Sequence, residues 1–197
     1  MLGAVKRICI FCGSSVGAHP AYGEAARQLG TAAVQRGLGL VYGGGNIGLM
    51  SLLADAALAR GGEVIGVIPQ ALVDKELAHR GVTQLHIVRS MHERKEMMAD
   101  LADGFIALPG GYGTLEEFCE MLTWAQLGLH AKPCGLLNVS GFYDAFLAQV
   151  DQAVRARFLP VEHRSLILVE SQPERLLARL LEFEPPTAHQ WIGRDEA

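Results

Sequence analysis

The chain has 197 residues, of which 50% are hydrophobic and 19% are charged, and its formal net charge is −4. This composition excludes an intrinsically disordered chain and predicts one domain with a sizeable buried core. No run of Lys and Arg reaches four residues, so we do not expect a surface for polymeric DNA or RNA. Apolar stretches are too short to span a bilayer or to form a signal peptide, which predicts a cytoplasmic protein without membrane contact.

Short apolar runs, typical of buried strands, alternate along the chain with amphipathic stretches, typical of helices. Strands are expected at residues 5–12, 38–42, 64–68, 85–88, 105–108, 134–138 and 166–169. Helices are expected at residues 21–36, 49–60, 91–102, 114–127, 142–157 and 173–181, whereas residues 70–82 lack a clear period and are expected to form a loop or a short helix. This alternation predicts a Rossmann-like, doubly wound parallel sheet with helices on both faces, in a single α/β domain. We place the domain at residues 1–182 and expect the tail at residues 183–197 to be poorly ordered.

Cys9 and Cys12 form a C-x-x-C pair, a spacing that binds metal or performs redox chemistry in some proteins. Here the pair falls in an apolar run that is expected to be a strand, where side chains three positions apart point to opposite faces. We therefore interpret both residues as small core thiols. The seven histidines show no metal-ligand spacing.

A first glycine-rich segment, residues 43–48, follows the second predicted strand and matches G-x-G-x-x-G. A dinucleotide-binding fingerprint would also need an acid at the end of the next strand, whereas Glu63 stands at the start of that strand. The segment is therefore either a tight turn or a place where the backbone approaches an anionic ligand closely, with Gly44 and Gly45 as candidate contacts.

A second glycine-rich segment, residues 109–117, reads PGGYGTLEE and joins a buried strand to a helix. Its glycines leave backbone N–H groups unobstructed and Thr114 adds a hydroxyl, so the segment predicts a phosphate cradle. The lysine of a P-loop is absent, and we do not expect ATP-driven chemistry.

Glu117 has two possible roles. Residues 114–117 have the spacing of a capping box, in which Thr114 is the N-cap and Glu117 bonds back to the backbone. A carboxylate facing a bound phosphate would repel it, however, so the alternative is that Glu117 faces another part of the ligand, such as a sugar.

Two further segments sit at the ligand-binding edge of the predicted sheet. Arg94 and Lys95 near the start of a helix form either a solvated, salt-bridged face or a binding site for an anionic substrate. Residues 12–15, which read CGSS and include Ser14, form either an ordinary turn or a further set of hydroxyl and N–H donors.

Residues 109–117, read together with Arg94 and Lys95, closely resemble the LOG proteins, which are phosphoribohydrolases of cytokinin riboside 5′-monophosphate long labelled lysine decarboxylases. The family pattern PGG-x-GT-x-x-E and the upstream RK pair are both intact. Residues 12–15, 43–50 and 124–130 also resemble family segments, and the likeness runs from about Val5 to Leu181.

The resemblance implies a Rossmann-like homodimer that needs no metal or organic cofactor. It also implies hydrolysis of the N-glycosidic bond of a nucleoside 5′-monophosphate, either cytokinin riboside 5′-monophosphate or AMP, to the free base and ribose 5-phosphate. The catalytic Arg and Glu of the family correspond to Arg94 and Glu117. The residues and the resemblance together predict substrate contacts from Ser14, Gly44, Gly45, Glu76, Lys95, Gly110, Gly111, Tyr112, Gly113, Thr114, Leu115, Glu116 and Thr123.

The predicted chemistry suits these residues. Breaking the bond between C1′ and the base builds positive charge on the ribose, which a carboxylate such as Glu117 stabilises while it orients or deprotonates water. Residues 110–114 would hold the phosphate so that C1′ meets this carboxylate. Arg94 is expected to serve either the phosphate or the departing base.

Two rival functions remain. A non-catalytic nucleotide sensor or carrier would use the same phosphate cradle and would need only the capping role of Glu117. A pyridoxal phosphate decarboxylase would need a lysine for its cofactor, and no accompanying pattern supports Lys95 or Lys132 in that role.

Overall fold

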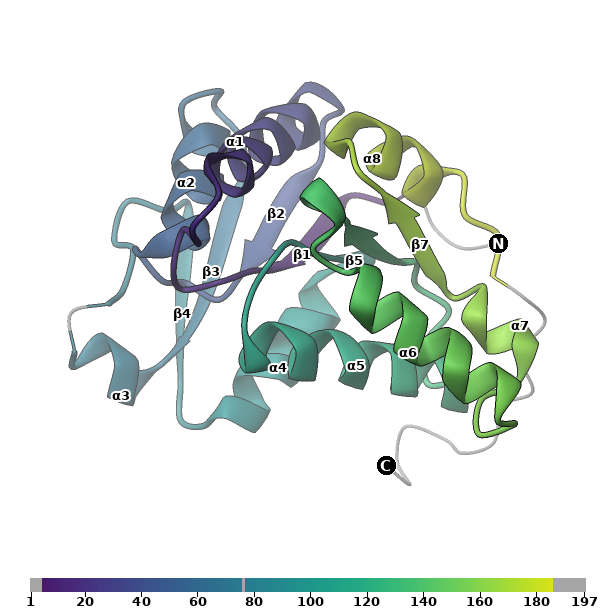
Figure 1. Ribbon diagram of the computed structural model, residues 1–197. Coiled ribbons are helices and arrows are strands. Elements are labelled where there is room, and N and C mark those ends of the chain that lie inside the picture. The colour runs from purple at the N-terminus through teal and green to yellow at the C-terminus, as the bar shows by residue number, and fades with distance from the viewer. Residues whose placement is uncertain (1–4, 76, 186–197) are drawn as a thin grey trace.

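Parallel strands form the centre of the protein, whose computed structural model describes residues 5–75 and 77–185 (Figure 1). The strands of this part of the chain are β1 (Arg7–Phe11), β2 (Gly39–Tyr42), β3 (Val64–Pro69), β4 (Gln84–Val88), β5 (Gly104–Ala107), β6 (Cys134–Leu137) and β7 (Ile167–Glu170). They pair in parallel in the order β4-β3-β2-β1-β5-β6-β7. The predicted parallel α/β sheet is confirmed.

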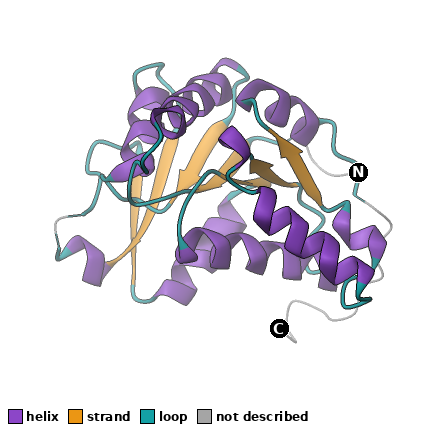
Figure 2. Cartoon of the chain, in the orientation of Figure 1, coloured by secondary structure: helices purple, strands orange, loops and turns teal. Residues whose placement is uncertain are grey.

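Helices cover both faces of this sheet (Figure 2). One layer holds α1 (Pro20–Gln35), α2 (Gly48–Leu58) and α8 (Pro173–Leu181), and the other holds α4 (Met91–Leu101), α5 (Tyr112–Leu127) and α6 (Asp144–Arg155). The short helices α3 (Gln70–Val73), η1 (Val139–Gly141) and α7 (Val161–Arg164) lie in connections between the larger elements.

Alternating side chains of each strand feed the two layers of the core. In β1, Ile8 and Ile10 pack with the layer of α1, α2 and α8, whereas Cys9 and Phe11 pack with the layer of α4 and α5. Both faces of the strand are therefore buried, which explains its continuous apolar sequence. Cys9 is a fully buried core thiol, as predicted.

The strand order creates a crevice beside β1. The chain leaves β1 for β2, β3 and β4, then returns and places β5 on the opposite side of β1. The loops that follow β1 and β5 therefore part in opposite directions, and such a switch point is where open α/β sheets bind ligands.

Element boundaries differ from the predicted ones by a few residues. The helix predicted at residues 142–157 begins at Asp144, because the chain first makes the tight turn of η1, in which Ser140 has a φ of 52°. Helix α7 was not predicted, since four residues after Pro160 are too few to show a helical period. Most of the tail expected to be poorly ordered lies outside the described residues. Within the described part, no helix has the length and apolar character needed to cross a membrane.

Candidate active site

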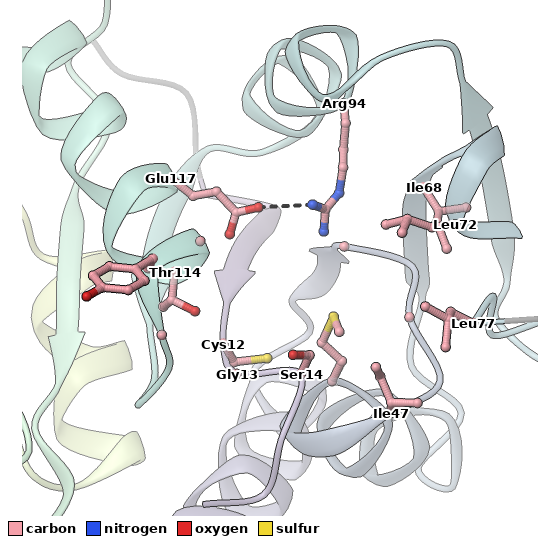
Figure 3. Close-up of a pocket in the computed structure, with 16 residues that line it drawn as sticks. Cys12, Gly13, Ser14, Ile47, Ile68, Leu72, Leu77, Arg94, Thr114 and Glu117 are labelled. Carbon is pink, nitrogen blue, oxygen red and sulfur yellow. Dashed lines mark hydrogen bonds and ion pairs between the residues drawn. The ribbon is translucent and has the colours of Figure 1, made fainter. Parts of the chain in front are cut away.

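A cleft of about 420 Å³ opens at the crevice beside β1, within the size range of small-molecule sites (Figure 3). The loops after β1, β2 and β5 line it, together with side chains from α4 and α5. The predicted site residues that line it are Ser14, Gly45, Arg94, Gly111, Tyr112, Gly113, Thr114 and Glu117. The structure thus gathers both predicted catalytic residues and most of the predicted phosphate cradle around one space.

The amino end of α5 forms one wall of the cleft. Gly111 is the N-cap, and no side chain of the described residues caps the helix. Leu115 N–H is the donor that bonds to the Gly111 carbonyl, so the N–H groups of Tyr112, Gly113 and Thr114 precede the first helical hydrogen bond. Unpaired N–H groups and the helix dipole together attract an anion at this end.

The predicted capping box is wrong. Helix α5 starts two residues before Thr114, so Thr114 lies in its first turn and Glu117 lies in its second. The Glu117 side chain bonds to Arg94 rather than to the N-cap backbone. The capping role is therefore excluded, and the carboxylate is available to the ligand.

Arg94 and Glu117 form a buried ion pair at the centre of the cleft. Arg94 Nη1 donates to Glu117 Oε1 at 3.2 Å, and the side chains are 10% and 9% exposed (Figure 3). The residues come from α4 and α5, which pack side by side on the same face of the sheet. The solvated helix face considered for Arg94 is excluded by this burial.

The Arg94 guanidinium is held on two further sides. Its Nε donates to the Val67 carbonyl of β3 at 3.1 Å, and Gly43 lies directly against its Nη2. A Cβ on Gly43 would stand 1.8 Å from Nη2, so only glycine leaves room for the guanidinium here. Close approach of this backbone to a side chain, rather than a dinucleotide contact, thus explains the first glycine of the 43–48 segment.

Burial raises the pKa of Glu117 above its ordinary value, and the positive charge of Arg94 opposes that rise. Removing a carboxylate from water disfavours its charged form, and an adjacent guanidinium restores part of the loss. The pair therefore holds a poorly hydrated carboxylate against a cation, and ionisable groups in such surroundings are typical of sites that handle protons.

The wall opposite Glu117 is apolar. Ile68 at the end of β3, Leu72 of α3, and Leu77 project into the cleft on that side, with Ile47 below them (Figure 3). Met50 of α2 also lines the cleft. Sequence reasoning did not single out these five side chains as contacts. Ile68 had a usable signal, because it ends a strand at the ligand edge, whereas Leu72 and Leu77 fall in a segment without a period.

Lys95 points away from the cleft. Its ammonium group bonds to Glu116 and lies 3.0 Å from Glu120, so it ties α4 to the outer side of α5. Its side chain is 9% exposed. The predicted substrate contacts of Lys95 and Glu116 thus have no support from their positions in this chain.

The other predicted substrate contacts that the structure describes do not line the cleft. Gly44 and Gly110 belong to its loops without lining it, and Leu115 packs into the core. Thr123 bonds to the Cys119 carbonyl and lines a second cavity between α5 and α6. Glu76 lies outside the described residues.

Cys12 is half-buried: it packs against the core, as predicted, but it also lines the cleft. Burial raises the pKa of its thiol, so the group stays protonated and is a poor nucleophile. Glu63 pairs with Arg7 at 2.7 Å at the amino end of its strand, far along the sheet from the cleft, as its position in the sequence indicated.

No lysine of the described residues lines the cleft, so the site does not fit pyridoxal phosphate. Lys132 donates to the Ala99 carbonyl and lies over the Phe105 ring. Among the same residues, no group of three or more His, Cys, Asp or Glu side chains is placed to hold a metal ion.

Comparison with known proteins identifies the family. The family described as possible lysine decarboxylase matches residues 50–180. Cytokinin riboside 5′-monophosphate phosphoribohydrolase LOG of Oryza sativa subsp. japonica is 51% identical over 180 residues, which are 91% of this chain and 74% of that protein. The chain belongs to the LOG family. A second LOG-family relative, cytokinin riboside 5′-monophosphate phosphoribohydrolase LOG7 of Arabidopsis thaliana, is 50% identical over 91% of this chain and 83% of that protein.

Solved structures share the fold of this LOG-family chain. The molybdenum cofactor carrier protein of Chlamydomonas reinhardtii has a TM-score of 0.68 at 20% identity, covering 90% of this chain and 99% of that chain. The molybdenum cofactor binding protein of Rippkaea orientalis has a TM-score of 0.66 at 24% identity, covering 88% of this chain and 94% of that chain. At these identities the likeness concerns the fold alone.

Proposed function

We propose that this protein hydrolyses the N-glycosidic bond of a nucleoside 5′-monophosphate, releasing the free base and ribose 5-phosphate. The observation that carries the proposal is the buried carboxylate of Glu117, which faces the cleft one turn beyond the uncapped end of α5. Its relatives at about half identity bear the name of cytokinin riboside 5′-monophosphate phosphoribohydrolases, which supports the same reaction in this chain.

The substrate's phosphate binds at the amino end of α5. The N–H groups of residues 112–114 and the Thr114 hydroxyl donate to it, and Ser14 faces it across the cleft. Holding the phosphate there fixes the distance from the 5′ end to C1′, so the ribose lies beside Glu117.

Glu117 acts on the sugar and on water. As the bond between C1′ and the base nitrogen breaks, the electron pair leaves with the base, and positive charge spreads over C1′ and the ring oxygen. The Glu117 carboxylate stabilises this charge and accepts a proton from the water that attacks C1′. The departing base takes up a proton, and the new C1′–O bond completes ribose 5-phosphate.

Arg94 acts as a fixed cation, because a guanidinium does not release its proton in proteins. It orients Glu117 and favours its charged form, because its positive charge opposes the rise in the pKa of Glu117 that burial causes. Its Nη2 has no hydrogen-bond partner among the described residues, so this nitrogen is free to donate to the substrate.

We also propose that the protein is a homodimer, as its family resemblance implies. Thr123, a predicted substrate contact, lines a cavity apart from the cleft, so it reaches substrate only in a second copy. Phe158 and Val161, which neighbour residues of that cavity in sequence, are 88% and 66% exposed. Light scattering after size exclusion tests the assembly, and a fully active monomer would refute it. The cytoplasmic location stays a prediction, which cell fractionation tests.

The decisive experiment incubates the purified protein with AMP and with isopentenyladenosine monophosphate and measures free base by chromatography. Glu117→Gln is assayed in parallel, because glutamine keeps an acceptor for Arg94 but has no charge. Thermal melts of both proteins check that the variant is folded. Release of base by the wild type, and its loss in a normally melting variant, is the expected result.

The opposite result would identify a different function. A protein that binds both nucleotides and releases no base from either is a sensor or carrier rather than a hydrolase. A Glu117→Gln variant that hydrolyses at the wild-type rate would exclude the carboxylate from the reaction.

A further inference from the structure

Residues 77–81 form a strap that crosses the glycine loop between β2 and α2. Asn46 N–H donates to the Leu77 carbonyl at 2.8 Å, and His79 N–H donates to the Gly44 carbonyl at 2.9 Å. Between these bonds, Gly45 and Ala78 form an antiparallel bridge. The strap is thus a short piece of sheet laid across the loop that contacts Arg94.

The His79 side chain fastens the end of this strap to α2. Its ring is buried, with Nε2 3.0 Å from Asp55 Oδ1 of α2 and Nδ1 3.2 Å from Gly81 N. A backbone N–H only donates, so Nδ1 is the acceptor, and in the neutral ring the proton sits on Nε2 and is donated to Asp55. One imidazole therefore connects the strap to a helix and also closes the turn that follows it.

The strap carries part of the apolar wall of the cleft. Leu77 is its first residue and lines the cleft, and Leu77 N–H donates to the carbonyl of Leu72, the neighbouring wall residue, at 3.3 Å. Both side chains face Glu117 across the cleft (Figure 3). The position of this wall thus depends on how firmly the strap is held.

The proposed function assigns the rest of the cleft and leaves this wall for the base. The phosphate lies at the amino end of α5 and the ribose beside Glu117, so the base extends toward the opposite side. An apolar wall contributes to affinity through contact with the flat base and with any alkyl group that it carries.

We propose that His79 and Asp55 are positioning residues that set the apolar wall for the substrate's base and thereby its preference for an alkylated base. This inference rests on the proposed function of the cleft. Neither side chain lines the cleft, so they act through Leu77 and not by contact with the substrate.

Asp55 offers the sharper test, because its side chain is 62% exposed and a helix accepts alanine at such a position. Asp55→Ala removes the acceptor for His79, whereas Asp55→Asn keeps an acceptor of the same shape. Glu24→Ala, which removes an exposed acid from α1, is the matched control. The measurements are kcat and KM with AMP and with isopentenyladenosine monophosphate.

We expect Asp55→Ala to raise KM for the isopentenyl substrate roughly tenfold, the discrimination that a methylene contact provides, and to raise KM for AMP less. Because Glu117 and Arg94 are untouched, kcat should stay within about twofold. Asp55→Asn and Glu24→Ala should behave as the wild type. An Asp55→Ala enzyme with unchanged KM for both substrates, or one that loses kcat alone, overturns the proposal.

Binding measured by calorimetry separates this inference from the proposed function. Glu117→Gln and Glu117→Gln/Asp55→Ala are titrated with the same two nucleotides, so that turnover is not needed. If the double variant alone loses affinity for the isopentenyl nucleotide, the result supports the proposed role of His79 and Asp55, even if the wild type releases no base. The proposal is refuted if each nucleotide binds the two variants with the same affinity, or if neither nucleotide binds.

Discussion

Gly43→Ala tests whether the placement of Arg94, rather than its charge alone, supports catalysis. The added Cβ would lie 1.8 Å from Arg94 Nη2, whereas ordinary contact begins at 3.4 Å, so the guanidinium has to retreat by about 1.6 Å. Its bond to Glu117 is already 3.2 Å long, and a retreat of that size breaks it. Gly43 does not have a positive φ, so the backbone itself accepts alanine.

We expect kcat to fall roughly 100-fold, because a displacement of about 1 Å at a catalytic group has that cost. A fall of this size corresponds to about 2.7 kcal/mol of transition-state stabilisation. The assay is release of free base from AMP at saturating substrate. Thermal melts of the variant establish that the loss is not due to unfolding.

A double-mutant cycle with Arg94→Met makes the reasoning refutable. If Gly43→Ala acts only by displacing Arg94, it causes no further loss in the Arg94→Met background, and the coupling energy equals the whole cost of the single substitution. Equal losses in both backgrounds would mean that the methyl group disturbs the glycine loop or the substrate directly. Full activity of Gly43→Ala would show that the pair has room to move.

Three further outcomes are expected. Burial raises the pKa of Glu117, so kcat/KM should begin to fall on acidification at a pH above the ordinary range of a carboxylate. Because Arg94 opposes that rise, Arg94→Met should shift the acidic side of the pH profile of kcat/KM to higher pH, and an unshifted profile would refute the electrostatic coupling of Arg94 to Glu117. Lys95→Met leaves its two carboxylate partners on α5 unpaired and should cost about 2 kcal/mol, lowering Tm by roughly 4–8 °C, with little change in KM; a raised KM with normal Tm would instead support substrate contact. Tyr143→Phe removes the hydroxyl that donates to the Leu108 carbonyl, just before the glycine-rich segment at residues 109–117. This loss should lower the free energy of unfolding by about 1 kcal/mol in a urea titration, and unchanged stability would mean that water replaces the hydroxyl.

The fold was predictable because each strand is buried on both faces and each major helix has an apolar side. In β1, all side chains from Ile8 to Phe11 are buried, and the same continuous apolar pattern marks β3 and β5. The ligand edge followed from the parallel sheet, which brings the segments after Phe11, Tyr42 and Ala107 together.

The contact between Arg94 and Glu117 was not predictable from spacing. The residues were singled out separately, one in a basic pair and the other in a glycine motif, and 23 positions separate them. Local rules even favoured a capping role for Glu117, because Thr114 stands three residues before it. The helix instead begins at Tyr112, since Gly111 adopts the extended N-cap conformation with no side chain to assist it.

The positions of Lys95 and Leu77 also could not be predicted from the sequence: Lys95 was an expected substrate contact that points away from the cleft, and Leu77 was not expected to line it. Lys95 stands next to Arg94 in sequence, yet one helical step turns it away from the cleft and toward two carboxylates of α5. Leu77 lies in a segment without any period. Besides its bond to Leu72, it is placed against the cleft by hydrogen bonds between the strap and Asn46 and Gly44, which are more than thirty positions away. Both placements are decided by tertiary contacts that no local pattern contains.

The shape of the guanidinium explains why an arginine stands at the centre of this site. Its Nε is fixed by the Val67 carbonyl and its Nη1 by Glu117, so the planar group is oriented before any ligand arrives. In the proposed reaction, a phosphate bound at α5 would bring further negative charge close to Glu117, which would favour protonation of the carboxylate and its loss as a base. Arg94 counters that effect from the other side of Glu117, while the dipole of α5 offsets the charge of the phosphate itself. A lysine ammonium is a point charge without fixed directions, so it would not hold both protein acceptors and still present a donor to the substrate.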